Sequence, residues 1–92
     1  MANSTLKNIM PVVRSFSDTV ASLNANSLVE LYIPTDAISG KTRYIMNVYP
    51  SSSHINIGST TMTVDGKVNI WIKNISNNAV TDITITALVI YI

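Results

Sequence analysis

Residues 80–92, the last thirteen of the chain, constrain its fold more than any other stretch. Every second side chain from Ile83 to Val89 is apolar, which is the spacing of one face of a β-strand. The opposite face carries threonines first and then becomes apolar, at Leu88, Ile90 and Ile92. A strand that ends apolar on both faces has to bury its second face as well. In a chain this small, we expect that second face to meet another copy of the chain.

The composition also favours strands. Isoleucine, valine and threonine together account for 32 of the 92 residues, whereas leucine occurs five times, glutamate once and glutamine not at all. β-branched residues favour strands, and the best helix formers are nearly absent. Because a chain of this length has room for one hydrophobic core, we predict a single all-β domain.

Six segments alternate between apolar and polar residues and are separated by turn residues. They predict strands at about 14–23, 27–33, 42–49, 54–64, 67–73 and 80–92, with a bulge or bend at Gly58-Ser59. Asp65-Gly66 predicts a hairpin, and a three-residue loop with Gly66 in the left-handed conformation places Met62 opposite Val68. Even spacing and short turns predict a six-stranded antiparallel sandwich of two sheets.

The alternation also predicts which residues face the interior. We expect the core to contain Val29, Leu31, Ile33, Tyr44, Met46, Val48, Ile55, Ile57, Met62, Val68, Ile70, Ile72, Ile83, Ile85, Ala87 and Val89. Residues 1–13 are different, because Leu6, Ile9 and Met10 recur at helical spacing before Pro11. We predict an N-terminal arm or short helix over 1–13 and a sandwich domain over 14–92.

The charge of the chain excludes several partners. Charged residues are 12% of the chain, about half the usual share for soluble domains, and the net charge is +1. Lysine and arginine are scattered, which argues against nucleic acid binding. No apolar run approaches the roughly 20 residues of a membrane span, and the amino terminus lacks the features of a signal peptide. We therefore expect synthesis in the cytoplasm and no membrane partner.

Catalytic and cofactor motifs are absent from the sequence. His54 is the single histidine and there is no cysteine, so a metal site within one chain is not expected. The acidic residues lie in different predicted strands and turns, and no nucleophile elbow, phosphate loop or dinucleotide fingerprint occurs. We predict a protein that is not an enzyme and has no catalytic residues, metal or cofactor.

Aromatic and apolar side chains occur on strand faces that the alternation places outward. Two interpretations are open: a sugar-binding platform, since rings stack on pyranoses, and a subunit interface, which is enriched in the same residues. The candidate ligand-binding residues are Trp71, Tyr49, Asn69, Arg43 and Tyr32. The candidate interface residues are Leu88, Ile90, Ile92 and Ile45.

Several segments together suggest a family. Four segments carry the resemblance: the strand 28–33, the Asp65-Gly66 hairpin, the stretch 68–78 and the terminal strand. Together they resemble the small β-sandwich modules of bacteriophage tail fibres and baseplate appendages, which look like H-type lectin domains. The resemblance covers residues 14–92 and carries over no sugar-binding residue. It implies a homotrimer in a phage or prophage virion, in contact with other virion proteins and with host-surface carbohydrate.

Two functions follow as hypotheses. The first is a homo-oligomeric virion appendage domain for attachment to the host surface, with glycan binding as an additional property. The alternative is a capsid decoration or head-fibre module that docks through its N-terminal arm. Both are structural or receptor-binding roles, and neither involves catalysis.

Overall fold

The computed structural model of the protein describes residues 10–92. The helix or arm predicted from Leu6 and Ile9 lies outside these residues. The first strand begins at Val12, so residues 12 and 13, which we had assigned to the arm, belong to the sandwich.

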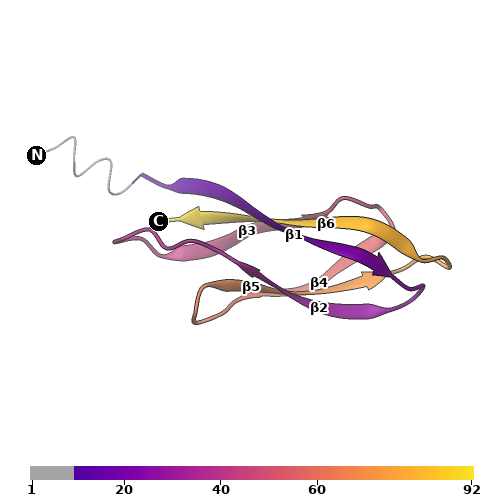
Figure 1. Cartoon of the computed structure of the whole chain (residues 1–92). Coiled ribbons are helices and arrows are strands. Elements are labelled where there is room, and N and C mark those ends of the chain that lie inside the picture. The colour runs from indigo at the N-terminus through magenta and orange to yellow at the C-terminus, as the bar shows by residue number, and fades with distance from the viewer. Residues whose placement is uncertain (1–9) are drawn as a thin grey trace, which may run out of the picture.

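The described part of the chain contains six strands and no helix. They are β1 (Val12–Leu23), β2 (Leu28–Pro34), β3 (Arg43–Pro50), β4 (Ile55–Met62), β5 (Lys67–Asn74) and β6 (Val80–Tyr91). They form two antiparallel sheets of three, with the orders β1-β6-β3 and β2-β5-β4, which lie one above the other (Figure 1). The predicted all-β, six-stranded antiparallel two-sheet fold is confirmed, with strand boundaries within one or two residues of those predicted.

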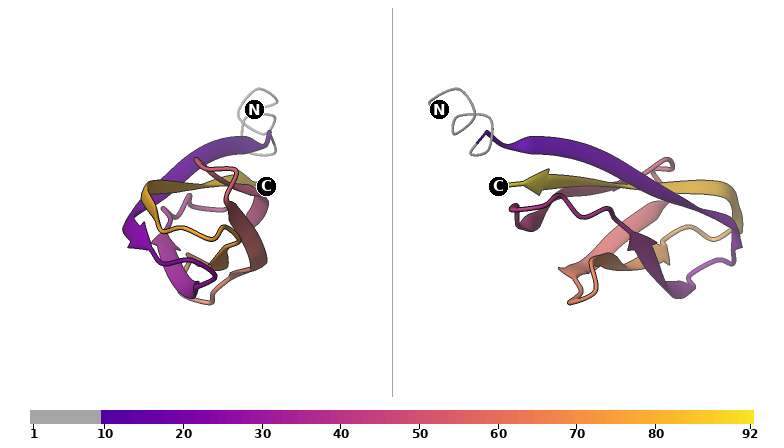
Figure 2. Two further views of the ribbon diagram at one scale, coloured as in Figure 1. Left: turned by 90° about the vertical axis from the view of Figure 1, so that its right-hand side faces the viewer. Right: turned by 60° about the vertical axis from the view of Figure 1, so that its left-hand side comes forward.

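The chain changes sheet at every connection except the β4–β5 hairpin. Strands far apart in the sequence therefore become neighbours: β1 pairs with β6 from Val12 opposite Tyr91 to Leu23 opposite Val80. The end-on view in Figure 2 shows the two layers around a shared interior. β5 and β6 are the central strands of their sheets, so they contribute most of that interior.

The core consists of the inward side chains of β5 and β6 with a few from the other strands. The fully buried apolar residues of these two strands are Val68, Ile70, Ile72, Ile83, Ile85, Ala87, Val89 and Tyr91. Burying one such aliphatic side chain contributes roughly 1.5–3 kcal/mol, so this double row is the main source of stability. All predicted core residues except two are buried or pack against the core. The prediction missed Leu23 and Tyr91.

The two wrong core predictions lie in β3. Tyr44 and Met46 are 54% and 56% exposed, while Ile45 packs against the core. The cause is a bulge: Ile45 pairs with Val89 and Asn47 with Leu88, so Met46 is an extra residue without a partner. The extra residue reverses the alternation. Tyr44 and Ile45, which precede the bulge, therefore point to the faces opposite to those expected from an uninterrupted strand.

The strands β4 and β5 contain two predicted features. Gly66 has a φ of 82°, Met62 pairs with Val68, and the Thr63 amide donates to the Lys67 carbonyl at 2.8 Å, which confirms the three-residue loop. The register also shifts between Ile57 and Thr60, which confirms the bulge at Gly58-Ser59.

One end of the sandwich is closed by Asn74, the buried polar residue of the core. Its Nδ2 donates to the carbonyls of Leu23 at 2.9 Å, Asn24 at 3.2 Å and Asn78 at 2.8 Å. Its Oδ1 accepts hydrogen bonds from the Ser76 amide and hydroxyl. The side chain thus joins the β1–β2 turn to the β5–β6 connection, and it satisfies backbone groups that would otherwise be buried without partners.

Candidate functional site

The outer face of the sheet β1-β6-β3 has an apolar half and a polar half. In the apolar half, Ile90 lies between Val13 and Tyr44, and Leu88 lies between Ser15 and Asn47. In the polar half, Thr84 and Thr86 of β6 are flanked by hydroxyl side chains of β1. We use the name apolar half for Val13, Tyr44, Met46, Leu88, Ile90 and Ile92.

Three of the four predicted interface residues lie in this apolar half. Leu88 and Ile90 are half-buried by their neighbours on the face, and Ile92 is 58% exposed. Ile45 was predicted to point outward, and this is wrong because the β3 bulge turns it toward the core. Tyr44 and Met46 were not predicted here, since a bulge without glycine gives no sequence signal. Val13 was not predicted here because residues 1–13 were assigned to the arm.

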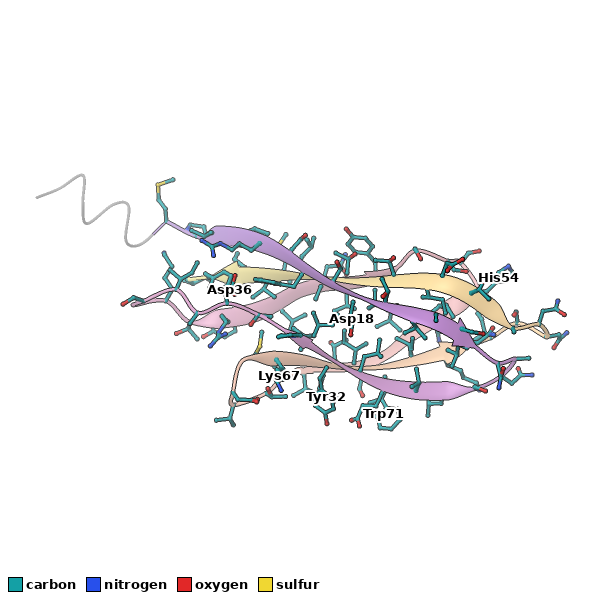
Figure 3. The ribbon with its side chains drawn as sticks, in the orientation of Figure 1. Asp18, Tyr32, Asp36, His54, Lys67 and Trp71 are labelled. Atoms are coloured by element: carbon teal, nitrogen blue, oxygen red, sulfur yellow. The ribbon has the colours of Figure 1, made fainter. Side chains whose placement is uncertain are left out.

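The outer face of the sheet β2-β5-β4 carries aromatic and polar side chains instead. Trp71 lies opposite Glu30, and Tyr32 lies opposite Asn69. Figure 3 shows Tyr32 and Trp71 side by side, pointing away from the other sheet. The Asn69 Nδ2 donates to Glu30 Oε2 at 2.9 Å and to the Leu31 carbonyl at 3.4 Å. We call Glu30, Tyr32, Asn69 and Trp71 the Trp71 face.

The predicted ligand-binding residues are therefore only partly brought together. Trp71, Tyr32 and Asn69 share one face, but Tyr49 pairs with Thr86 in the other sheet. Glu30 was not predicted as part of a site, although its spacing of two from Tyr32 placed both on one face. A carboxylate beside an aromatic ring is the signal that could have identified it.

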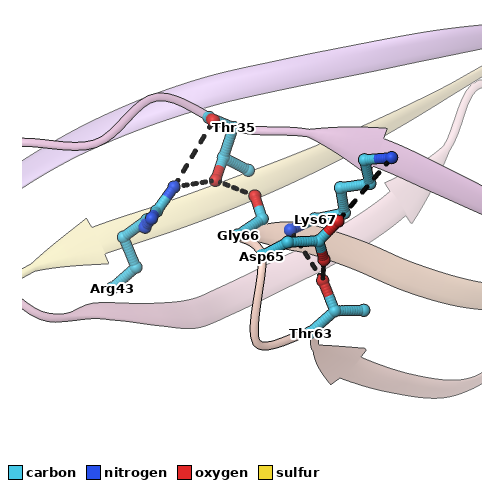
Figure 4. A network of polar contacts seen from close by, with 6 residues as sticks. All are labelled: Thr35, Arg43, Thr63, Asp65, Gly66 and Lys67. Carbon is cyan, nitrogen blue, oxygen red and sulfur yellow. Dashed lines mark hydrogen bonds and ion pairs between the residues drawn. The ribbon is translucent and has the colours of Figure 1, made fainter.

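Arg43 lies inside the sandwich end and is used by the fold. Its Nη1 donates to Thr35 Oγ1 at 3.0 Å and to the Thr35 carbonyl at 3.4 Å (Figure 4). It also donates to the Asp36 carbonyl at 3.1 Å. The Thr35 hydroxyl in turn donates to the Gly66 carbonyl, and the Tyr91 hydroxyl donates to the Asp36 carbonyl at 2.7 Å. The guanidinium thus holds the β2–β3 loop to β3, and Thr35 links that loop to the β4–β5 hairpin. Arg43 belongs to the sheet opposite to the one that carries the Trp71 face.

The hairpin beside Arg43 carries an exposed polar cluster. The Thr63 hydroxyl donates to Asp65 Oδ1, and Lys67 Nζ lies 3.8 Å from Asp65 Oδ2 (Figure 4). The hydrogen bond from Thr63, with a smaller contribution from the charge of Lys67, lowers the pKa of Asp65. These contacts fix the loop and leave the carboxylate ionised at neutral pH.

A cleft of about 590 Å³ opens between the edge strands β3 and β4. The two bulges lie in its walls, and its lining residues are Ile45, Met46, Asn47, Val48, Ile57, Gly58, Thr60, Thr61 and Met62. The lining contains no ionisable side chain. The polar side chains of the cleft are threonine hydroxyls and the Asn47 amide. None of its lining side chains can act as a general acid or base.

Residues 10–92 contain neither a cluster of metal ligands nor a membrane-spanning helix. His54 is exposed beside the β3–β4 turn, and no three His, Asp or Glu side chains of this part of the chain gather as metal ligands. The same residues form no helix with the length and apolarity to cross a membrane.

Comparison of the chain with protein-family models, with curated proteins and with solved structures finds no match. The candidate sites thus rest on the geometry of the two outer faces.

Proposed function

We propose that the protein is a homo-oligomeric structural domain of a phage or prophage virion, an appendage module that attaches the particle to the host surface. The observation that carries this proposal is the apolar half of the sheet β1-β6-β3. The two-sheet fold is compatible with the resemblance to tail-fibre and baseplate modules. The trimeric stoichiometry, the location in the virion and the contact with other virion proteins come from that resemblance.

The apolar half is a contiguous surface. Val13, Ile90 and Tyr44 form one row across three strands, and Met46 and Leu88 extend it. Val13 is 49% exposed, and Tyr44 and Met46 are each more than half exposed. Contiguous apolar surface of this kind on a soluble protein marks an interaction site. Burial of the patch would also add apolar area that a single small domain lacks.

A second copy of the chain is the occupant that the chemistry favours. The residues of the apolar half and their row neighbours Ser15 and Asn47 carry no charge. Two such surfaces can meet without like-charge repulsion, and without burying an unpaired ion, which would cost several kcal/mol. The adjacent threonine half ends the patch, so the contact has a defined boundary on β6.

The test is light scattering of purified full-length protein and of two matched variants. Ile90→Asp puts a charge in the apolar half, whereas Thr84→Asp puts the same charge on the same face of β6 in the polar half. We expect the unaltered protein and Thr84→Asp to be oligomers, and Ile90→Asp to have the mass of one 10.0 kDa chain. Tyr44→Asp, at a more exposed position, repeats the test if Ile90→Asp does not fold.

A monomeric unaltered protein at micromolar concentration would remove the proposal. An Ile90→Asp or Tyr44→Asp variant that is folded by circular dichroism and still oligomeric would do the same. Capture of the oligomer on host cells, compared with its monomeric variant, tests the attachment role, since several copies bind a surface with higher avidity than one.

A further inference from the structure

The Trp71 face combines an aromatic surface with a held carboxylate. Trp71 is 36% exposed and Tyr32 is 51% exposed on neighbouring strands of one open sheet face. Glu30 lies directly opposite Trp71, and its Oε2 accepts the hydrogen bond from Asn69. That bond uses one of the two carboxylate oxygens, so Oε1 can accept hydrogen bonds from a ligand.

The edge strand β4 lies close to the tryptophan. On the other flank of Trp71 lies the β4 bulge, where Gly58 has no side chain. A Cβ at Gly58 would lie 3.0 Å from the Trp71 carbonyl oxygen and 3.4 Å from its Cβ. Glycine thus lets β4 approach the Trp71 backbone closely.

We propose that the Trp71 face binds a neutral pyranose. The C–H face of the sugar ring stacks on Trp71 or Tyr32, and two adjacent hydroxyls donate to the Glu30 carboxylate. Asn69 is a positioning residue, because its amide holds that carboxylate. This inference names the ligand of the attachment role and rests on the proposed function for its biological setting; the binding itself uses the sheet opposite to the apolar half.

The polar groups favour a sugar over a protein partner. Hydroxyl groups are hydrogen-bond donors that suit a carboxylate acceptor, while an aromatic face suits the apolar side of a pyranose. The cores of protein interfaces are depleted in glutamate and lysine, yet Glu30 lies next to Trp71, and Lys73 follows it two residues later on the same face. The negative charge of Glu30 repels an acidic group placed against the carboxylate itself, so the hydrogen bonds to Glu30 favour a neutral sugar.

The experiment uses the single tryptophan of the chain as its reporter. The full-length oligomer is titrated with methyl β-D-galactopyranoside, methyl β-D-glucopyranoside and methyl α-D-mannopyranoside, and with the methyl glycoside of N-acetylneuraminic acid as the acidic sugar. We expect a saturable change of Trp71 emission with at least one neutral glycoside, at a half-saturation on the order of 10 mM for so small a ligand. The acidic sugar should not bind.

Variants are compared by saturation-transfer NMR, which does not need the tryptophan. We expect Trp71→Ala to weaken binding at least about tenfold and Glu30→Gln about threefold, while Trp71→Phe retains it. Tyr49→Ala, which removes an exposed ring from the other sheet, is the matched control and should bind normally. Light scattering of each sample reports the assembly separately, so loss of binding and loss of oligomerisation are distinguished.

Three results would overturn the inference. In the first, none of the three neutral glycosides binds saturably to the unaltered protein at concentrations up to about 100 mM, roughly ten times the expected half-saturation concentration. Another is normal binding by Trp71→Ala. The third is a Trp71→Ala protein with a changed oligomeric state, because the face would then be a contact between copies of the chain.

Discussion

The two ends of the sandwich are closed by polar side chains of different kinds. At one end Asn74, a neutral and fully buried amide, joins two connections by five hydrogen bonds. At the other end Arg43, a half-buried cation of β3, donates to the β2–β3 loop, and Thr35 of that loop donates to Gly66 of the β4–β5 hairpin. Both side chains donate hydrogen bonds to backbone carbonyls of connecting segments, which need partners where the strands end.

The difference between the ends is one of burial, and it decides how much each network contributes. A hydrogen bond shielded from water is expensive to remove, because the groups left behind cannot find water instead. Groups at the Arg43 end that lose their partners are closer to solvent and can be rehydrated. We therefore expect the Asn74 end to be the more sensitive to substitution, and the Arg43 end to depend more on pH and on local sterics.

The outer face of β6 follows the same division. The Asn74 end lies under its threonine half, and the Arg43 end lies under the apolar half, because Arg43 pairs with Tyr91 and Tyr44 with Ile90. The proposed assembly surface thus lies over the end of the sandwich where Arg43 makes its hydrogen bonds. A change at that end should disturb assembly, while one at the Asn74 end should act on stability alone.

The largest effect is expected from Asn74→Ala. The substitution leaves the buried carbonyl of Leu23 and the amide of Ser76 without the partner that Asn74 provides, whereas the carbonyls of Asn78 and Asn24 keep hydrogen bonds from the Ser76 hydroxyl and the Ser27 amide. At about 1–3 kcal/mol for each buried group without a partner, we expect a loss of roughly 3 kcal/mol or more in the free energy of unfolding, measured by urea denaturation.

Asn78→Ala is the matched control for Asn74→Ala. It removes an amide from the same connection, but Asn78 is exposed and contributes its backbone to the network. We expect a change within about 0.5 kcal/mol. Asn74→Asp separates hydrogen bonding from packing, because it keeps the volume and loses both donors; a mild Asn74→Asp variant would contradict the role given to the amide.

A smaller effect is expected from Gly66→Ala at the opposite end. Gly66 has a φ of 82°, and a Cβ there would collide with the Arg43 guanidinium. We expect a loss of about 2 kcal/mol in urea denaturation, of which the left-handed conformation accounts for about 1 kcal/mol. Gly40→Ala is the control, since its φ is 77° and nothing lies within 4 Å of the added Cβ. Equal losses in the two variants would show that the Arg43 contact is unimportant.

The contrast between Gly66 and Arg43 also shows what the sequence could predict. The left-handed Gly66 follows from local chemistry, because a three-residue loop that ends in glycine pairs the apolar Met62 with the apolar Val68. The strands and the buried rows of β5 and β6 follow from alternation in the same way. Such features depend on neighbours in sequence, so the sequence contains their signal.

The wrong predictions share a different cause. Arg43 and Ile45 were placed outward and Tyr44 and Met46 inward, because alternation was extended through Met46, where the structure has a bulge. Asn74 was missed because its partners, Leu23 and Asn24, are about fifty residues away in sequence. The Trp71 face was half predicted, since Trp71 and Tyr32 follow from alternation whereas their pairing with Asn69 and Glu30 needs the sheet register.

The smallest effect is expected from Asp65→Asn, and it depends on pH. The hydrogen bond from Thr63 lowers the pKa of Asp65, so the folded chain binds this proton less readily than the unfolded chain. The carboxylate therefore stabilises the fold fully above about pH 4, its ordinary range, and this stabilisation is lost as the pH falls through the lowered pKa. Thermal unfolding should show a slightly higher midpoint temperature for the unaltered protein than for Asp65→Asn at pH 7, and the difference should shrink as the pH falls below about 4. Asn-Gly keeps the turn preference, so the comparison isolates the charge; a difference that grows in acid would contradict the direction of the pKa shift.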